Sequence, residues 1–223
     1  MKNWYQLTES ENLEKLGVTS EGLSSQQADS LLEKHGKNVL EESKKKSVFQ
    51  VFLSQFADLM VIILIIAAIV SMFSGSVEST IVIFAVITLY AILGTVQHVK
   101  AEKSLESLKS LSSPSAKVIR DGRKIEIDSE NIVPGDIVVL EAGDLVVADG
   151  RIINNYSLQV NESSLTGEST NIDKSVETIE KEVPLADRTD MVFSGSLVTY
   201  GRAIVVVTET GMNTEIGKIA TLM

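Results

Sequence analysis

The sequence predicts an α+β membrane protein with a transmembrane helical hairpin, an all-β cytosolic domain and a small N-terminal helical element. Two long apolar blocks lie close together between residues 51 and 96, a helical pattern precedes them, and many short strand-like segments follow residue 114. The expected parts are a helical element at 1–46, the hairpin at 47–99, a stalk at 100–113 and the all-β domain at 114–223.

Composition and charge exclude several functional classes. The net charge of −10 argues against a nucleic-acid partner, because phosphate binding needs clustered Lys and Arg. The absence of cysteine excludes disulfides, thiolate metal sites and cysteine nucleophiles. The charged stretch Met1–Gly36 lacks the apolar core of a signal peptide. His35 and His98 stand without metal-ligand partners, so we expect neither a metal site nor a cofactor site in this chain.

Capping signals predict two helices in the N-terminal element. Ser24–Gln27 matches a capping box, in which Ser caps the first turn and Gln reaches back to it. The helix that follows should stop at Gly36, which can adopt a left-handed cap. A shorter helix, Glu11–Leu16, should end at Gly17.

The two apolar blocks have the length of membrane helices. Phe56–Phe73 holds eighteen residues, or about 27 Å of helix, close to the roughly 30 Å hydrocarbon core. Its one charge, Asp58, lies near the end and can reach the interface. Ile81–Val96 reaches membrane length if Val77–Thr80 join it. Either block alone could be a buried core helix, but two blocks separated only by Ser74–Ser76 favour a transmembrane hairpin.

Charges around the hairpin predict its orientation. The lysines flank its two ends, at Lys44–Lys46 before the first block and at Lys100, Lys103 and Lys109 after the second, whereas the turn 74–80 has no Lys or Arg. By the positive-inside tendency, both ends face the cytosol and the turn faces out. We therefore expect a multi-pass protein of the cell membrane, in contact with lipid, with its N-terminus and its all-β domain in the cytosol.

After the second block the helical pattern continues as an amphipathic stalk, with Leu105, Leu108 and Leu111 at helical spacing, until Pro114 ends it. The pattern then changes to short strands separated by glycines and Gly-Asp pairs, compatible with a barrel or a distorted jelly roll. The strand candidates are 116–120 and 124–127, joined by a turn at Asp121-Gly122, then 137–140, 151–153, 157–160, 191–198 and 203–208.

The segment Thr166-Gly167-Glu168-Ser169 is the candidate catalytic site. Gly167 permits a tight turn, and Glu168 is a carboxylate flanked by two hydroxyl side chains. A carboxylate held in this way can orient a water molecule and accept its proton. Taken alone, the four residues fit a β-turn with a solvated Glu better than a catalytic loop.

Four further segments change that balance, because together with the loop they resemble the P-type ATPase family in order and spacing. Thr166–Ser169 resembles the signature of the family's actuator domain. The other segments are Pro134-Gly135-Asp136, Gly143-Asp144 followed by Ala148-Asp149-Gly150-Arg151, Phe193-Ser194-Gly195-Ser196, and Thr214-Glu215-Ile216-Gly217-Lys218-Ile219. The N-terminal stretch 22–38, the pair Ala101-Glu102 and the lack of cysteine resemble type II cation pumps, with bacterial calcium pumps as the nearest match.

The resemblance implies that ATP and Mg²⁺ serve the complete protein by phosphorylating an aspartate. Glu168 would then activate the water that attacks this aspartyl phosphate, while Thr166 and Gly167 shape the loop and Ser169 holds it. The family's Asp-Lys-Thr-Gly-Thr motif is absent from the chain, so we expect a fragment that is inactive alone and that depends on missing phosphorylation, nucleotide-binding and membrane segments. The alternatives are a non-catalytic membrane-anchored regulatory module, a complementing subunit, and a pump for Na⁺, K⁺, H⁺ or Mn²⁺ instead of Ca²⁺.

Overall fold

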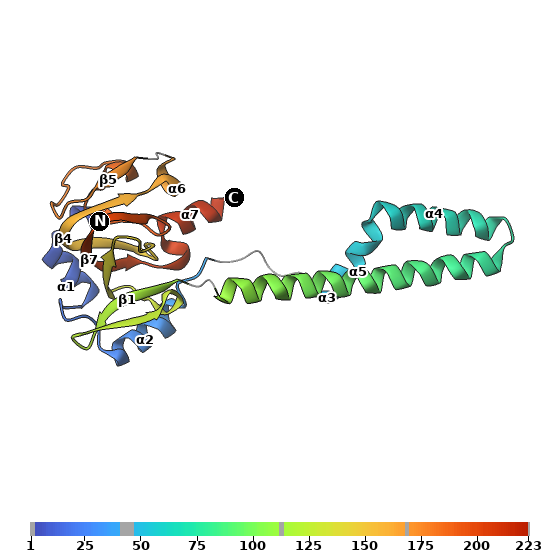
Figure 1. Ribbon diagram of the computed structural model, residues 1–223, viewed down its shortest axis with the longest axis horizontal. Helices are drawn as coiled ribbons and strands as arrows, with labels where there is room; N and C mark the ends of the chain where they lie inside the picture. Colours follow the sequence, from blue (N-terminus) through green and yellow to red (C-terminus); the bar gives the residue numbers. More distant parts are fainter. Residues whose placement is uncertain (1–2, 41–46, 112–113, 168–169, 223) are drawn as a thin grey trace. The chain divides into compact units, whose positions relative to one another are not determined.

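The computed structural model describes residues 3–40, 47–111, 114–167 and 170–222, and the chain divides into two compact units (Figure 1). One unit combines Met1–Glu41 with Ser113–Met223, and the other is Glu42–Ser112. The N-terminal residues therefore fold with the C-terminal part of the chain and not with the apolar segment that follows them directly.

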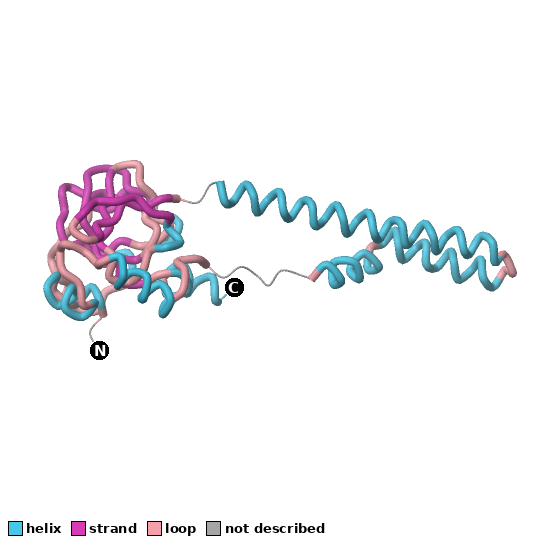
Figure 2. Tube along the Cα trace, turned by 90° about the horizontal axis from the view of Figure 1, so that it is seen from below, coloured by secondary structure: helices cyan, strands magenta, loops and turns pink. Residues whose placement is uncertain are grey.

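The apolar unit is entirely helical. Its elements are α3 (Val48–Ser54), the 3-10 helix η2 (Gln55–Ala57), α4 (Leu59–Phe73) and α5 (Val77–Leu111). Helices α4 and α5 lie side by side and are joined by the short turn at residues 74–76 (Figures 1 and 2). Helix α5 is unbroken through 35 residues, or about 52 Å, so the second apolar block and the stalk residues 100–111 form a single helix, while residues 112–113 of the predicted stalk lie outside the described residues.

The first apolar block is not the single helix from Phe56 that the sequence predicts. Asp58 has an extended backbone, with φ −68° and ψ 137°, and its Oδ1 accepts a hydrogen bond of 2.9 Å from the N–H of Met60. This side chain caps a new helix, because Asp satisfies an N–H group that otherwise lacks a partner at a helix start. The segments Val48–Ala57 and Leu59–Phe73 are consequently bent by 66° at this position.

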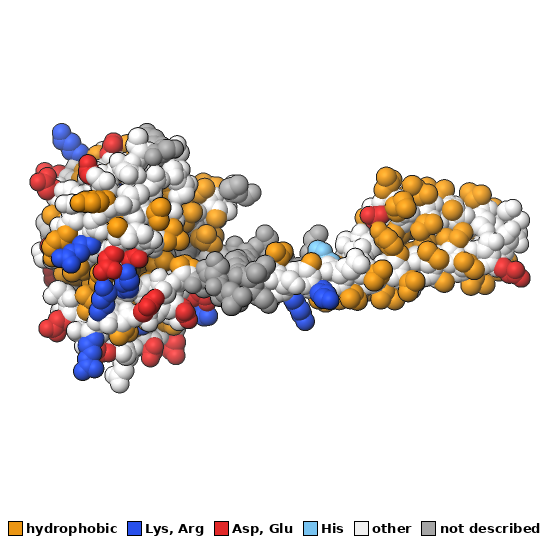
Figure 3. All heavy atoms as spheres, viewed as in Figure 1, with side chains coloured by type: hydrophobic (Ala, Val, Ile, Leu, Met, Phe, Trp, Pro, Cys, Tyr) orange, Lys and Arg blue, Asp and Glu red, His pale blue; other side chains and the backbone are white. Residues whose placement is uncertain are grey.

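The surface of the apolar unit is hydrophobic rather than polar (Figure 3). The stretch Val77–Leu105 of α5 is long and apolar enough to cross a membrane, and only 17% of its most apolar 18 residues are buried. A core helix of a soluble protein would be mostly buried, which makes α5 a candidate membrane helix. Exposed large side chains of α4 include Leu59, Met60, Ile66, Val70 and Phe73. That α4 and α5 together span a membrane stays a prediction.

Two predicted N-terminal helices are present, as α1 (Glu9–Leu16) and α2 (Ser25–His35). Each starts with a capping box, at Thr8 and Ser24 respectively, and Gly17 ends α1 in the left-handed conformation. Helix α2 stops at Gly36 as predicted, but the predicted left-handed cap is wrong: φ is 76° whereas ψ is −179°. The 3-10 helix η1 (Trp4–Gln6), which precedes α1, was not predicted.

The unit formed by Met1–Glu41 and Ser113–Met223 contains a seven-stranded antiparallel sheet. Its strand order is β2-β1-β3-β7-β4-β5, and β6 pairs with β4. The strands are β1 (Ser115–Arg120), β2 (Arg123–Asp128), β3 (Ile137–Glu141), β4 (Asp149–Asn161), β5 (Asn171–Asp173), β6 (Met191–Val192) and β7 (Leu197–Glu209). The predicted hairpin at Asp121-Gly122 is confirmed, with Arg120 opposite Arg123. A jelly-roll arrangement stays a prediction.

Several strands differ from the prediction, and β5 was not predicted. The candidates 151–153 and 157–160 form one strand, β4, because register shifts between Ile152 and Gln159 absorb the break in the pattern. The candidate 191–198 is interrupted by a turn at residues 193–196, and β7 starts before the predicted residue 203. The domain is also not all-β. It contains α6 (Ser163–Thr166), α7 (Glu215–Leu222) and the 3-10 helices η3 (Ser129–Asn131), η4 (Leu185–Asp187) and η5 (Gly211–Asn213).

Hydrophobic clusters cover both faces of the sheet. Neighbouring residues of a strand point to opposite faces, so one strand can contribute to both clusters. Ile152 and Val205 belong to one hydrophobic cluster, whereas the adjacent Ile153 and Val206 belong to another. The second cluster includes residues of the N-terminal segment, namely Val18, Leu23 and Ala28. The N-terminal helices thus complete the core on one face of the sheet.

Candidate functional site

The predicted catalytic segment follows the short helix α6 (Figure 1). Thr166 ends this helix, and both its N–H and its Oγ1 donate to the carbonyl oxygen of Glu162, at 3.0 and 3.1 Å. The N–H of Gly167 donates to the carbonyl oxygen of Ser163 at 3.0 Å. Glu168 and Ser169 lie outside the described residues. The described half of the segment is therefore anchored to the end of β4, directly before the two undescribed residues.

Gly167 has a left-handed backbone conformation, with φ 76° and ψ −3°. A Cβ atom placed on Gly167 would meet no atom within 4 Å, so space does not demand glycine here. The backbone does, because an L-residue in this conformation costs roughly 1–2 kcal/mol. The tight turn that the sequence predicts at Gly167 is thus confirmed.

Asp149 joins two of the other motif segments beside this helix. Its buried carboxylate accepts a hydrogen bond of 2.8 Å from the N–H of Ser194 and one of 2.7 Å from the N–H of Glu215, the first residue of α7. Burial raises the pKa of Asp149 to about 6, although these two backbone donors act in the opposite direction. The next contact leads to α6, since Ser164 Oγ donates to the carbonyl oxygen of Gly195 at 3.1 Å. Three motif segments are thereby linked into one hydrogen-bonded assembly with α6.

The start of α7 is closely packed against η5. A Cβ atom on Gly217 would lie 2.5 Å from the carbonyl oxygen of Gly211, so no larger residue fits without a shift of the backbone. Thr214 is buried, donates to the same carbonyl oxygen at 2.7 Å and accepts from the N–H of Gly217 at 3.1 Å. This explains why the segment Thr214–Ile219 combines a hydroxyl residue with a glycine three positions later.

The remaining segment, Pro134–Asp136, and the first half of the Asp149 segment, Gly143-Asp144, stabilise turns around β1 and β3. Asp136 is fully buried, and its carboxylate accepts hydrogen bonds from Nε and Nη2 of Arg120, at 2.8 and 2.7 Å, and from the N–H of Val133. The side chain of Asp144 accepts a hydrogen bond of 2.9 Å from the N–H of Glu141 and forms an ion pair with Lys117. These carboxylates fix loop geometry, which is a structural role.

A buried ion pair that the sequence did not indicate lies at the base of α6. Lys174 Nζ is 2.5 Å from Glu162 Oε1, and both side chains are fully buried. Burial raises the pKa of the Glu162 carboxyl and lowers the pKa of the Lys174 ammonium, while each charge opposes the shift of the other. Arg151, from the fourth β-strand, forms a similar buried pair with Asp190 at 3.1 Å. A Glu and a Lys on either side of a loop are too common in sequences to signal such a pair.

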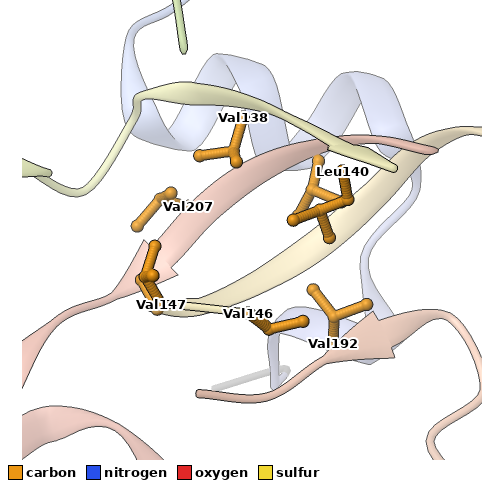
Figure 4. Close-up of a pocket in the computed structure, with 8 residues that line it drawn as sticks. Val138, Leu140, Val146, Val147, Val192 and Val207 are labelled. Atoms are coloured by element: carbon orange, nitrogen blue, oxygen red, sulfur yellow. The ribbon is translucent and has the colours of Figure 1, made fainter. Parts of the chain in front are cut away.

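Two cavities in the sheet domain are smaller than ordinary ligand pockets. No group of three His, Asp or Glu side chains among the described residues could hold a metal ion. An apolar cavity of about 10 Å³ lies between the strands, with Val138, Leu140 and Val192 directed into it (Figure 4). A second, near Lys117 and Glu126, measures about 130 Å³, whereas ligand pockets usually hold about 300–1,000 Å³.

Comparisons with known proteins assign both ends of the chain. A family model described as the P-type ATPase actuator domain matches residues 110–223. A second model, described as the N-terminus of cation transporters and ATPases, matches residues 4–71. These two matches together include the N-terminal helices, part of the apolar unit and the sheet.

Curated relatives match the chain over nearly its whole length. The calcium-transporting ATPase lmo0841 of Listeria monocytogenes is 47% identical over 98% of this chain and 25% of its own length. Calcium-transporting ATPase 1 of Bacillus cereus is 44% identical over 100% of this chain and 26% of its own. The cation-transporting ATPase pma1 of Synechocystis is 40% identical over 93% of this chain and 22% of its own. The chain thus spans about a quarter of the length of the curated relatives it matches.

Proposed function

Because this chain belongs to the P-type ATPase family of cation transporters, we propose that its loop Thr166–Ser169 promotes the hydrolysis of an aspartyl phosphate in an ATP-driven pump. In this step a water molecule attacks phosphorus, Glu168 takes the proton of the water, and the aspartate leaves as a carboxylate. The chain supplies the loop, and the phosphorylated aspartate belongs to another segment.

The observation that carries this proposal is the assembly around α6. Asp149 links the loop before β7 to the start of α7, and Ser164 links the same loop to α6. A base that acts on a phosphoryl group of another segment has to arrive with a fixed geometry, because misplacement by about 1 Å slows a reaction severely. One hydrogen bond thus ties α6, at the start of the loop, to a segment that Asp149 in turn fixes to two others, and this supports such a fixed geometry.

Within the loop, each residue has a separate proposed role. Thr166 closes the last turn of α6 through its two donors to Glu162, and Gly167 turns the chain toward Glu168. Glu168 orients and deprotonates the attacking water. Ser169 holds the loop by hydrogen bonding once it enters the phosphorylation site. The whole loop is then delivered as a unit when its domain moves.

We propose that the transported cation is Ca²⁺ and that the chain sits in the cell membrane with both ends in the cytosol. The calcium assignment is supported by the names of the relatives from Listeria and Bacillus, and the broader name of the Synechocystis relative leaves Na⁺, K⁺, H⁺ and Mn²⁺ as alternatives. Residues 47–99 would contact lipid as a hairpin, and residues 100–113 would form the stalk between membrane and cytosol. The element at 1–46 and the actuator domain at 114–223 would be cytosolic.

Among the described residues, no group of acidic or histidine side chains could hold a metal, and two cavities of the sheet domain measure only about 10 and 130 Å³. We therefore propose that ATP and Mg²⁺ act on phosphorylation and nucleotide-binding segments beyond this chain, together with further membrane helices. The chain alone would neither hydrolyse ATP nor transport ions.

The experiment that tests this function is the substitution Glu168→Gln in the full-length protein. After phosphorylation with radiolabelled ATP and a chase with unlabelled ATP, the phosphoenzyme of the variant should decay at least a hundredfold more slowly, since general-base catalysis contributes about 10²–10⁴ in rate. Its formation should be unchanged. The matched control is Glu177→Gln, which alters an exposed carboxylate of the same chain.

Two results would contradict the proposal. Decay at the wild-type rate in Glu168→Gln would favour the alternative function, a membrane-anchored regulatory module without catalysis. Formation of a phosphoenzyme by residues 1–223 alone would show that the phosphorylated aspartate lies within this chain.

A further inference from the structure

We propose that the buried ion pair between Glu162 and Lys174 positions the hydrolytic loop, acting as a clamp across the base of the segment that runs from α6 to β5. This inference rests on the proposed function, because it assigns a role to residues that support that loop. Neither side chain is expected to touch the phosphoryl group, so both are positioning residues.

The pair brackets the loop in sequence and in space. Glu162 directly precedes α6, and Lys174 directly follows β5, so the two charges enclose the whole segment between them. Strand pairing of Asn161 with Asn171 and of Gln159 with Asp173 brings the two ends together. Lys174 Nζ then reaches Glu162 Oε1 at 2.5 Å. A bond across these two ends fixes the start and the end of the loop against each other.

The same residues also connect the clamp to α6 and to the neighbouring motif segment. The carbonyl oxygen of Glu162 accepts from the N–H groups of Leu165 and Thr166, at 2.9 and 3.0 Å. Lys174 Nζ lies 5.6 Å from the centre of the Phe193 ring, at the start of the segment that binds Ser164. A shift of either charge would therefore be passed directly to the residues that hold Thr166.

Stability alone does not account for the pair. Both charges are fully buried, and among the described residues neither has a further hydrogen-bond partner to offset its lost hydration. Replacement of such a pair by apolar residues of similar size is often neutral or stabilising, whereas removal of one partner is strongly destabilising. What the charges add over an apolar pair is a defined mutual position, because an ion pair has directional geometry that a methionine contact lacks.

The first test measures the loop in the intact chain by hydrogen exchange. In the double variant Glu162→Met/Lys174→Met, the amides of Leu165, Thr166 and Gly167 should exchange at least tenfold faster than in the wild type. The thermal midpoint and the exchange of β7 amides should stay unchanged. Lys174→Arg, which keeps the charge, should retain the slow exchange at the loop.

A matched control removes a buried pair elsewhere in the same sheet. Arg120→Met/Asp136→Met removes both partners of the pair between Arg120 and Asp136, and it should speed exchange around β1 and β3 while the loop keeps its protection. The clamp is disproved if the double variant exchanges at the loop like the wild type. It is also disproved if the double variant unfolds, or if its loop and strand amides accelerate together, because each result assigns the pair to general stability.

The second test follows dephosphorylation in the full-length protein. The double variant should form phosphoenzyme normally and lose it about tenfold more slowly than the wild type. If Glu168→Gln blocks decay and the double variant does not affect it, only the clamp is wrong. If Glu168→Gln decays normally, the proposed function itself fails, whatever the double variant does.

Discussion

Asp149 is the residue on which the arrangement of the motif segments depends most directly. Its two carboxylate oxygens accept from the N–H groups of Ser194 and Glu215, and its own carbonyl oxygen accepts from Thr208 Oγ1 at 3.2 Å. Burial raises the pKa of this carboxylate and dominates over the two backbone donors and the charge of Lys218, which act in the opposite direction. The residue thus joins three segments, although its burial disfavours the charged form of its carboxyl.

This leads to a prediction about pH. The pKa of Asp149 is about 6 in the folded protein, above the ordinary value of 3.8. The folded state therefore holds the proton more tightly, so this group's contribution to stability is complete below about pH 3.8 and is lost as pH rises through about 6. The loss corresponds to about 3 kcal/mol. In Asp149→Asn, the free energy of unfolding should fall correspondingly less between pH 4 and pH 6 than in the wild type.

Fluorescence of the single tryptophan, Trp4, can report this unfolding in denaturant titrations at each pH, because Trp4 Nε1 donates to Glu209 within the same unit. The control is Asp121→Asn. Hydrogen bonds from Ser25 lower the pKa of Asp121, so its stabilising contribution is lost only as pH falls below its ordinary value, and the slope between pH 4 and pH 6 should stay that of the wild type. Equal slopes for Asp149→Asn and the wild type would refute the prediction.

At the scale of single residues, the sequence predicted what depends on local backbone chemistry. The capping box at Ser24 and the turn at Gly167 are confirmed, because each needs only a few neighbouring residues. The ion pair of Glu162 and Lys174 could not be predicted in this way. It depends on strand pairing and on burial, and neither is visible in the spacing of an acidic and a basic residue.

At the scale of elements, long uniform patterns were predicted better than interrupted ones. Helix α5 was predicted as an apolar block followed by an amphipathic stalk, and both parts form one helix. Strand β4 was predicted as two pieces, because its register shifts and the positive φ of Ser157 break the alternation of apolar residues. Its partner β7 restores continuity, and a partner strand is information that the segment's own sequence does not contain.

Asp58 offers a prediction for the apolar unit at this scale. Its extended backbone separates α3 from α4, and its side chain caps α4. Alanine has the highest helix propensity and cannot cap, so Asp58→Ala should join the two helices and reduce the 66° bend. Since the chain has no cysteine, spin labels at Phe49→Cys and Ile66→Cys can report the change, and their separation should increase.

Asn is the matched control at this position, because its side-chain oxygen caps helices as well as that of Asp. Asp58→Asn should keep the separation between the labels at the wild-type value. If Asp58→Ala also keeps it, packing against α5 determines the bend and the cap does not.

At the scale of the whole molecule, the chain divides into an apolar helical unit and a second unit that contains the sheet. The apolar residues 42–112 interrupt a unit formed by the residues on either side. The N-terminal helices supply Val18, Leu23 and Ala28 to a cluster that includes Ile137 and Val206. Hydrophobic periodicity predicted these helices but not their packing partner, since periodicity shows which face is apolar and not what covers it.

This arrangement makes the orientation in the membrane testable, because both flanks of the apolar unit must lie on the same side to fold together. The lysine distribution predicts that this side is the cytosol and that the turn 74–76 faces out. On intact cells, a membrane-impermeant maleimide should label Ser76→Cys, whereas Glu21→Cys and Glu177→Cys should react only after the membrane is opened. All three positions are exposed in the structure, so an absent signal reflects the membrane and not burial in the protein. Labelling of Glu21→Cys and Glu177→Cys on opposite sides would contradict the shared fold of the two flanks, and labelling of both on intact cells would invert the orientation that we propose for the pump.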